Sequence, residues 1–277
     1  MPVTFSPLRY PGGKTKLYNV VRPLIFNTIG SGGTYVEPFA GGAGLALKLL
    51  LNDDVSRIVL NDIDENIYVF WQACLERTDE LCDMVNETIP SIAEWDNQRE
   101  IYLQAKASSD LERAFATLFL NRCNISGVIS GGPIGGRKQN GKYLIDARYN
   151  ASDIIRKLRA IGARRSQIVF YNLEATEFLN NVVSRLSVPK SFVNIDPPYV
   201  NKGPQLYRNS FMESHHRNLS DEIKKLQHSW ILTYDECDLI HQLYSEYRQI
   251  PISLSYSAGH AKKGNELLIL SPTIHQQ

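Results

Sequence analysis

The sequence predicts an α/β protein with an open, mostly parallel sheet and an inserted, mostly helical subdomain. Five short apolar runs are typical of buried parallel strands. They are TYVEPF (34–39), RIVLND (57–62), QIVFYN (167–172), SFVNID (191–196) and SWILTYD (229–235). Helical patterns alternate with them: AGLALKLLL (43–51), EATEFLNNVVSRL (174–186) and LSDEIKKLQ (219–227). Because such sheets bind ligands at the carboxyl ends of their strands, we expect the functional site at that edge.

The alternation of strands and helices lapses between about Leu75 and Ala160. We therefore expect one domain from residues 1–74 and 161–277, and an inserted subdomain from residues 75–160. Within the insertion, Asn140-Gly141 between short flanks predicts a β-hairpin with a type I′ turn.

Charge is distributed unevenly along the chain. The 30 Lys and Arg residues nearly cancel the 29 Asp and Glu residues. From Asn121 to Arg165, however, ten basic residues stand against two acidic ones, whereas from Asn52 to Glu112 fifteen acidic residues stand against four basic ones. A basic block is expected for a polyanion partner, and a solvated surface face explains it equally well.

The composition is that of an ordinary globular protein, with 43% hydrophobic and 21% charged residues. The four cysteines form no CxxC pair and no zinc-type cluster, so we expect buried free thiols and no metal. The chain has no signal-like apolar start and no run of membrane-spanning length. We expect a cytoplasmic protein without a membrane partner.

The segment RYPGGKTKL (9–17) ends like a phosphate-binding P-loop, which has the pattern G-x-x-x-x-G-K-[ST]. The first glycine of that pattern would fall at position 8, where the chain has Leu8, and no apolar strand precedes the loop. A nucleotide-hydrolase function is therefore excluded, and the glycines and Lys14 must serve another purpose.

A second glycine-rich segment, YVEPFAGGAGLALKLL (35–50), joins a strand that ends in an acid to a helix. This arrangement seats adenosine-containing cofactors, because small residues let the backbone approach the ligand and the helix start offers free amides. The dinucleotide fingerprint G-x-G-x-x-G is not met, since its third position is Leu47. Asp62 ends the next strand, where an acid typically binds ribose hydroxyls. A tight structural turn is the alternative explanation.

The segment FVNIDPPYVN (192–201) predicts a site for a planar ring that bears an amino group. Asp196 follows a buried strand, and two prolines without amide hydrogens leave nearby acceptors available. The amine would donate to Asp196 and to the Pro197 carbonyl, while the ring stacks on Tyr199.

Taken together, these segments resemble the Dam-like DNA adenine-N6 methyltransferases, which use S-adenosylmethionine. In the family's order, RYPGGK (9–14) resembles the N-terminal cofactor motif, EPFAGGAG (37–44) the FxGxG loop, NDID (61–64) the ribose-binding acid and DPPY (196–199) the catalytic motif. LNRCNISG (120–127) resembles the segment before the DNA-reading hairpin. WILTYDECDLIHQLY (230–244) and LSYSAGHAKKGNELLI (254–269) resemble the C-terminal part. The resemblance covers nearly the whole chain and implies a Rossmann-like methyltransferase sheet with a target-recognition insertion.

The resemblance also implies a set of site residues. The catalytic residues would be Asp196, Pro197, Pro198 and Tyr199. The cofactor would contact Tyr10, Lys14, Glu37, Pro38, Phe39, Ala40, Gly41, Gly42, Asp62, Ile63, Glu174 and Asp196. Tyr10 would pack beside the methionine moiety, and Lys14 would reach the active-site acids or the cofactor carboxylate. The DNA-binding candidates are Arg122, Asn124, Arg137, Lys138, Asn140 and Lys142.

The implied substrate is double-stranded DNA, from which the target adenine is flipped into the pocket. We expect a monomer in a bacterial cell or a phage-infected host, with a cognate restriction endonuclease as a candidate partner.

Three positions have alternative interpretations. Ala43 replaces the last glycine of FxGxG and is small enough to serve there if its backbone keeps a negative φ. Glu174 either contacts a ligand or is a first-turn helix acid favoured by the dipole. The pair His215-His216 lacks a third metal ligand, so we interpret it as histidines of a loop or helix start.

Other functions are disfavoured by single features. Cytosine-N4 enzymes more often carry S-P-P-Y and glutamine methyltransferases N-P-P-Y, whereas this chain has D-P-P-Y. A DNA-binding protein that has lost catalysis is disfavoured because Lys14, Asp62, Asp196 and Tyr199 are intact. A nicotinamide dehydrogenase needs neither DPPY nor a basic insertion.

Overall fold

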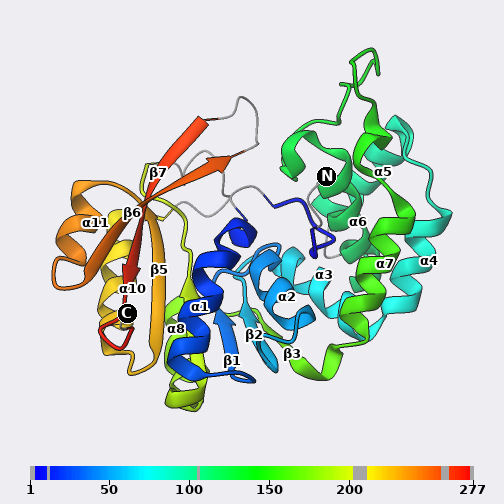
Figure 1. Ribbon diagram of the computed structural model, residues 1–277. Helices are drawn as coiled ribbons and strands as arrows, with labels where there is room; N and C mark the ends of the chain where they lie inside the picture. Colours follow the sequence, from blue (N-terminus) through cyan, green and yellow to red (C-terminus); the bar gives the residue numbers. More distant parts are fainter. Residues whose placement is uncertain (1–3, 11–12, 105–106, 202–210, 257–261, 275–277) are drawn as a thin grey trace. The chain divides into compact units, whose positions relative to one another are not determined.

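The structure is a computed structural model that describes residues 4–10, 13–104, 107–201, 211–256 and 262–274 (Figure 1). The chain forms two compact units. Unit 1 comprises Met1–Gly13 and Asp64–Phe170, and unit 2 comprises Lys14–Ile63 and Tyr171–Gln277. No helix in the described part of the chain is long and apolar enough to span a membrane.

A seven-stranded sheet with the order β3-β2-β1-β4-β5-β7-β6 forms in the described residues. Its strands are β1 (Thr34–Glu37), β2 (Arg57–Asn61), β3 (Ile168–Tyr171), β4 (Ser191–Ile195), β5 (Ser229–Asp235), β6 (Arg248–Tyr256) and β7 (Lys262–Leu270). β1 pairs in parallel with β2 and β4, and β4 with β5, while β7 is antiparallel to both β5 and β6. The predicted mostly parallel α/β sheet is confirmed, with two further C-terminal strands.

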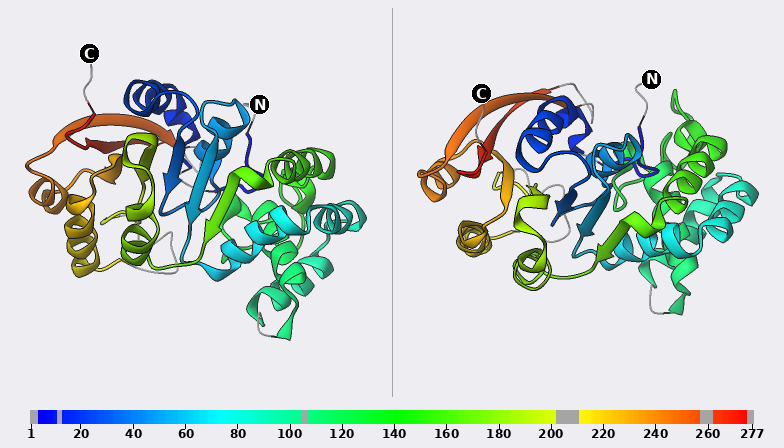
Figure 2. Two further views of the ribbon diagram at one scale, coloured as in Figure 1. Left: turned by 90° about the horizontal axis from the view of Figure 1, so that it is seen from below. Right: turned by 60° about the horizontal axis from the view of Figure 1, so that its bottom comes forward.

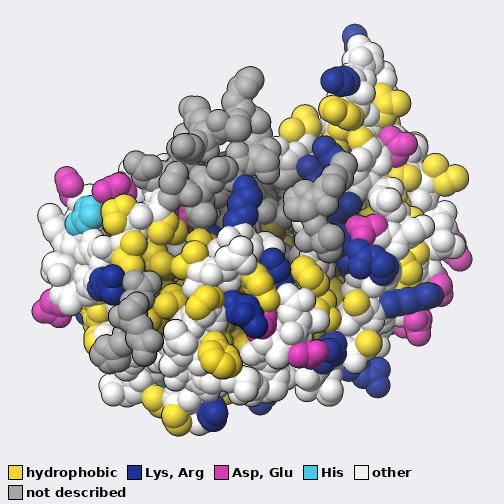
Figure 3. All heavy atoms as spheres, in the orientation of Figure 1, with side chains coloured by type: hydrophobic (Ala, Val, Ile, Leu, Met, Phe, Trp, Pro, Cys, Tyr) yellow, Lys and Arg dark blue, Asp and Glu magenta, His cyan; other side chains and the backbone are white. Residues whose placement is uncertain are grey.

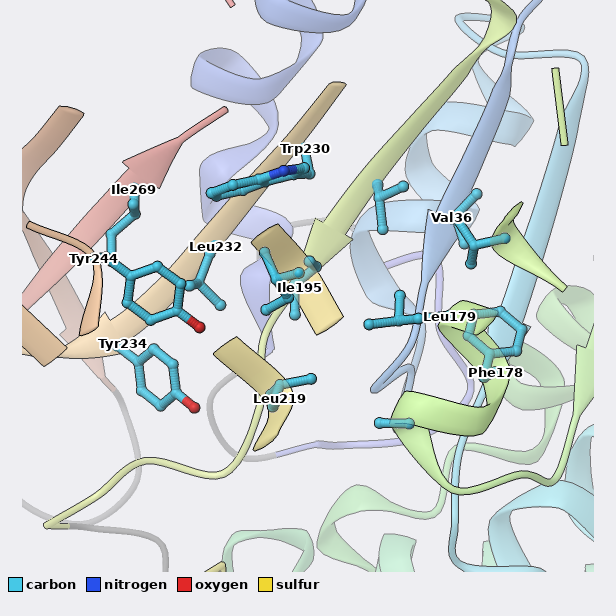
Figure 4. Packing of buried hydrophobic residues seen from close by; sticks show 14 of the residues in the cluster. Val36, Phe178, Leu179, Ile195, Leu219, Trp230, Leu232, Tyr234, Tyr244 and Ile269 are labelled. Carbon is cyan, nitrogen blue, oxygen red and sulfur yellow. The ribbon is translucent and has the colours of Figure 1, made fainter. Parts of the chain in front are cut away.

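The parallel strands of unit 2 are buried because helices cover both of their faces. α1 (Tyr18–Ile29) and α2 (Gly44–Leu51) lie on one face, and α8 (Ala175–Asn181) and α10 (Glu213–Lys225) lie on the other (Figure 2). In Figure 4, Phe178 of α8 lies below Val36 of β1, and Leu219 of α10 lies below Ile195 of β4, all within one hydrophobic cluster. Burial of this apolar surface stabilises the unit and fixes where each strand ends.

Unit 1 is mostly helical. Its α-helices are α3 (Glu65–Glu76), α4 (Thr78–Glu87), α5 (Ile92–Leu103), α6 (Asp110–Cys123) and α7 (Ala151–Gly162). α6 is its centre: it packs against α3 and α5, and a capping box between Ser109 and Glu112 begins it.

The unit extends beyond the predicted insertion of residues 75–160 at both ends. α3 belongs to it because its buried side packs on α6 and α7, and Trp71 stacks on Phe170 at 5.9 Å. The first residues of the chain also belong to it, since Asn121 exchanges two hydrogen bonds with the backbone of Arg9.

The β-hairpin predicted at Asn140-Gly141 is wrong. Residues 134–143 form turns and bends, and one antiparallel bridge joins Asn124 to Pro133. A type I′ turn needs positive φ at both central residues, but the left-handed position falls on Gln139 with φ 48°. The Gln139 side chain donates to the carbonyls of Ile134 and Gly136 and accepts from the amide of Ile145. These side-chain bonds replace the ladder of a hairpin, and we call residues 131–144 the basic loop.

Asn124 lies at the base of the basic loop and is fully buried. Its Oδ1 accepts from the indole of Trp95 at 2.6 Å, and its Nδ2 donates to the carbonyls of Val128, Ile129 and Gly131. Both ends of its side-chain amide are thus hydrogen-bonded inside unit 1, and its predicted contact with DNA stays a prediction.

Replacing Asn124 should therefore cost stability. Asn124→Ala leaves the Trp95 indole and several carbonyls without partners, and we expect a loss of about 2–4 kcal/mol in the free energy of unfolding. The matched control is Asn140→Ala on the exposed loop, which should change stability by less than about 0.5 kcal/mol. Urea unfolding of both variants measures this, and equal stabilities would contradict the structural role of Asn124.

Candidate active site

The segment Asp196-Pro197-Pro198-Tyr199 follows β4 directly, at the carboxyl edge of the parallel strands. Asp196 retains 23% exposure of its side chain, and Tyr199 is half-buried beside Tyr234, with ring centroids 6.2 Å apart. The ends of the neighbouring strands bring Glu37 from β1 and Asp235 from β5 to the same edge. The sheet therefore gathers the predicted catalytic segment with two further acids.

Lys14 reaches this edge from the short 3₁₀ helix η1 (Lys14–Leu17). Its ammonium is nearly buried, lies 3.1 Å from Oδ1 of Asp196 and donates to the hydroxyl of Tyr199 at 2.6 Å. Oδ1 of Asp196 also accepts from the Thr233 hydroxyl at 2.6 Å. One oxygen of the Asp196 carboxylate is thus held from two sides, and in the described residues no hydrogen bond involves Oδ2.

Asp235 holds the chain that follows the catalytic segment. Its two carboxylate oxygens accept the backbone amides of Val200 and Asn201 at 2.9 and 2.8 Å. The side chain is 4% exposed, so these charge-assisted bonds form in a poorly hydrated place. The sequence did not predict a role for Thr233 or Asp235. The feature that could have indicated one is that TYD ends an apolar strand next to the strand before DPPY.

The glycine-rich loop Pro38–Ala43 leads from β1 into α2. Gly41 adopts φ 46°, and its amide donates to Oδ2 of Asp62 at 2.8 Å. Gly44 lets η1 approach closely, because a Cβ there would lie 2.5 Å from the Thr15 hydroxyl. The glycines therefore position Lys14 as well as opening the loop, which explains why the two glycine-rich segments occur together.

Ala43 is the N-cap of α2 in the left-handed conformation, with φ 47° and ψ 31°. The expectation of a negative φ at this position is wrong. The turn requires the left-handed geometry because the Ala43 amide donates back to the Ala40 carbonyl while α2 begins at the next residue. A side chain there carries a strain of about 1–2 kcal/mol.

Asn61 fixes the loops on either side of the end of β2. Its amide nitrogen donates to the carbonyls of Pro38 and Leu173, and its oxygen accepts from the Leu173 amide. Asp62 and Ile63 follow directly, and Ile63 exposes 51% of its surface. The motif NDID predicted cofactor contacts for Asp62 and Ile63 but no role for Asn61.

These residues fit S-adenosylmethionine. Asp62 has a partly exposed carboxylate that would suit ribose hydroxyls, and the exposed Ile63 would offer an apolar surface to an adenine ring. Phe39 is half-buried and packs edge-on against Phe211 at 6.0 Å. The acids at this edge suit a donor that carries a positive charge on sulfur.

Glu37 is buried, and its carboxylate accepts from the Tyr35 hydroxyl at 2.9 Å. Burial raises the pKa of the Glu37 carboxyl to about 8, against the Tyr35 hydrogen bond, which lowers it, and together with the nearby Asp196, which raises it further. The side chain therefore carries a proton at neutral pH, and contact with a cationic ligand would favour its release.

Two further residues were predicted to contact the cofactor, Glu174 and Tyr10. Glu174 is the exposed N-cap of α8, where it accepts the amides of Thr176 and Glu177, so the helix-acid interpretation describes its position. Tyr10 belongs to unit 1, where its carbonyl accepts from the Gly13 amide, and its contact with the cofactor stays a prediction.

His215 and His216 lie in the first turn of α10, as the helix-start interpretation predicted. His216 is buried, and its Nδ1 is 2.7 Å from the Tyr234 hydroxyl. Among the described residues, no group of three His, Cys, Asp or Glu side chains could hold a metal ion.

The DNA-binding candidates of unit 1 fall into buried and exposed residues. Arg122 is 8% exposed and donates to the carbonyls of Arg148 and Pro7, and its predicted contact with DNA stays a prediction. Its burial lowers the pKa of the guanidinium to about 10. The exposed candidates all lie on the basic loop, and they are Arg137, Lys138, Asn140 and Lys142. Figure 3 shows Lys and Arg side chains at the projecting tip of this loop.

A model of the D12 class N6 adenine-specific DNA methyltransferases matches residues 10–257, and so nearly the whole chain. The chain belongs to this family. The match confirms the Dam-like resemblance and the predicted reaction class, methyl transfer from S-adenosylmethionine to adenine N6 of DNA.

Curated relatives agree with this family. The chain is 21% identical to the type II methyltransferase M.MjaIII of Methanocaldococcus jannaschii over 69% of its length and 68% of the relative. It is 29% identical to the DNA adenine methylase of Escherichia coli K12 over 44% of this chain, and this match spans 41% of that enzyme.

Among solved structures, a putative RNA methyltransferase from Pyrococcus horikoshii superposes with a TM-score of 0.45 and 10% identity. The match covers 98% of this chain and 87% of that one.

Two identical substitutions in α2 test the strain at Ala43. Ala43→Gly and Ala46→Gly each remove one buried methyl group, but only the first relieves a left-handed side chain, and only the second places glycine inside a helix. We expect Ala43→Gly to be more stable than Ala46→Gly by about 2 kcal/mol. Thermal or urea unfolding measures the difference, and an Ala43→Gly variant no more stable than its partner would contradict the assigned conformation.

The buried Glu37 should make stability depend on pH. The folded carboxyl has a pKa of about 8 and the unfolded one about 4.3, so between these values the folded state binds more protons. Glu37 then lowers the free energy of unfolding as pH rises, by up to about 1.4 kcal/mol per pH unit. Glu37→Gln should flatten the decline between pH 5 and 8 in urea unfolding, whereas the exposed Glu246→Gln should not. Parallel curves for all three proteins would refute the buried, protonated carboxyl.

Proposed function

We propose that this chain is a site-specific methyltransferase that acts on an adenine flipped out of duplex DNA, with Asp196-Pro197-Pro198-Tyr199 as its catalytic segment. The residue assignment rests on the hydrogen bonding of the Asp196 carboxylate. Lys14 and Thr233 hold its Oδ1, which leaves Oδ2 for an incoming amine.

The reaction needs little chemistry from the protein, but it needs close alignment of the reacting atoms. The N6 lone pair of adenine is delocalised into the ring, so the amine is a poor nucleophile. Oδ2 of Asp196 and the Pro197 carbonyl accept its two hydrogens and favour a lone pair localised on nitrogen. The bound cofactor supplies a methyl group already activated on a sulfonium. The protein therefore contributes mainly alignment for an in-line displacement.

Positive charge develops on N6 as the methyl group arrives. Asp196 stabilises it, and the surplus proton leaves through this carboxylate or to water. Tyr199 supplies a flat face for the flipped base, and stacking offsets part of the few kcal/mol that unstacking costs. The hydrogen bond from Lys14 to its hydroxyl fixes the orientation of the ring.

The exposed basic loop supports contact with DNA outside the pocket. Arg137, Lys138 and Lys142 offer charge to phosphates, and Asn140 offers an amide to a base edge. Arg137 is paired with Asp96 through two bonds of 2.8 Å, so binding a phosphate with this side chain requires exchanging that partner.

We further propose that the enzyme acts as a monomer in the cytoplasm of a bacterial cell or phage-infected host, because one flipped adenine needs one active site. Its similarity to a type II methyltransferase supports a cognate restriction endonuclease as a partner.

The test is to express the chain in a host without adenine methylation and to sequence the DNA by a method that detects N6-methyladenine. We expect one short motif to be methylated by the intact chain. Asp196→Ala should reduce the rate by at least about 100-fold, because it removes the acceptor that stabilises the developing charge. Urea unfolding confirms that each protein is folded, and calorimetry measures cofactor binding by the intact chain. A soluble chain that binds S-adenosylmethionine but leaves the DNA unmarked would redirect the search to RNA or another amino acceptor.

A further inference from the structure

Lys14 has a second acidic neighbour that the mechanism above does not use. Glu266 lies on β7, outside the residues matched by the family model, which end at 257. Its side chain is completely buried, and its Oε2 is 3.5 Å from the Lys14 ammonium.

The register of the sheet makes the position of Glu266 costly. In the antiparallel pairing of β5 with β7, Glu266 stands directly opposite Asp235, and both side chains are buried. Like charges directly opposite each other on neighbouring strands destabilise a sheet, and buried carboxylates need compensation. Asp235 receives it from two backbone amides, and Lys14 is the cation next to Glu266.

The same cation also serves the catalytic segment. The neighbours of the Lys14 ammonium at this edge include Oδ1 of Asp196, the Tyr199 hydroxyl and Oε2 of Glu266. The first two are proposed to meet the adenine directly. Glu266 is the third, and it lies on a strand of the sheet rather than on a loop.

We propose that Glu266 is a positioning residue for methyl transfer, which fixes the Lys14 ammonium and through it the Asp196 carboxylate and the Tyr199 ring. This proposal rests on the proposed function of that site. Glu266 touches neither adenine nor cofactor in this role. It shares the charge of Lys14, so that the ammonium keeps its place without drawing Asp196 away from the amine.

The groups beside the Lys14 ammonium include Asp196 after β4, Tyr199 of the catalytic segment and Glu266 of β7. A residue that acts by holding this ammonium should lose its effect on the rate once the lysine is removed.

The experiment is a double-mutant cycle of Glu266→Gln and Lys14→Met. The readout is the single-turnover rate of methyl transfer from labelled S-adenosylmethionine to unmethylated genomic DNA. We expect Glu266→Gln to slow the step about 10-fold in the intact background and less than about 2-fold in Lys14→Met. The dissociation constant of the cofactor should change less than about 3-fold, because Glu266 does not touch it. Glu266→Asp, which keeps the charge, should recover part of the rate.

The matched control is Asp153→Asn in unit 1, which removes the carboxylate partner of another buried lysine, Lys157, at 2.8 Å. It should leave the rate per folded enzyme unchanged. Losses from Glu266→Gln that are equal in both backgrounds, or a Glu266→Asp variant no faster than Glu266→Gln, would overturn the positioning role.

If Glu266→Gln does not fold, Glu266→Asp is measured in the intact chain and in Lys14→Met. A loss of rate only in the protein that keeps Lys14 supports the proposal, whereas equal losses in both proteins overturn it. If the intact chain transfers no methyl group to DNA, the proposed function fails first, and the positioning role that rests on it fails with it.

Discussion

A buried ammonium organises the active edge of this protein. Lys14 is 6% exposed, and an uncompensated charge in such a place costs several kcal/mol. The structure compensates it with groups from different parts of unit 2: a carboxylate after β4, a phenol in the catalytic segment and a carboxylate on β7. These elements must be assembled together for the lysine to be stable there. The same constraint holds the catalytic carboxylate in one orientation, so the stability of the unit and the geometry of the reaction depend on one set of contacts.

The glycine-rich loop, which follows β1, helps to place Lys14 at this edge. Gly44 allows η1 to lie against α2, and η1 begins with Lys14. The loop also stores strain, because Ala43 holds a left-handed backbone that favours glycine. Strain of this kind persists only where surrounding contacts determine the conformation, and such positions cluster at ligand sites. Here the amides of Gly41 and Ala43 are both committed to that conformation, the first to Asp62 and the second to Ala40.

Unit 1 combines a rigid base with exposed charge. Asn124 and Arg122, which follow one another closely on the chain, are consumed by hydrogen bonds inside the unit. They hold the two ends of a loop that exposes three basic residues, Arg137, Lys138 and Lys142. Gln139 closes the loop with its side chain, where a hairpin would use backbone bonds. The loop is therefore anchored at its base by side-chain hydrogen bonds. It has no strand edge that could pair with other chains.

The sequence by itself determined the sheet and the reaction class. Buried parallel strands appear as continuous apolar runs, and the residues after them must meet at one edge, so Asp196, Tyr199 and Asp62 could be placed at that edge before any coordinates. Only the tertiary structure decided which polar side chains are available to a ligand. Nothing local distinguishes Asn124 from Asn140, or Arg122 from Arg137, because burial depends on helices distant in the sequence. Thr233, Asp235 and Glu266 were missed for the same reason. Their roles come from strand register and from Lys14, which is more than 200 residues away from them.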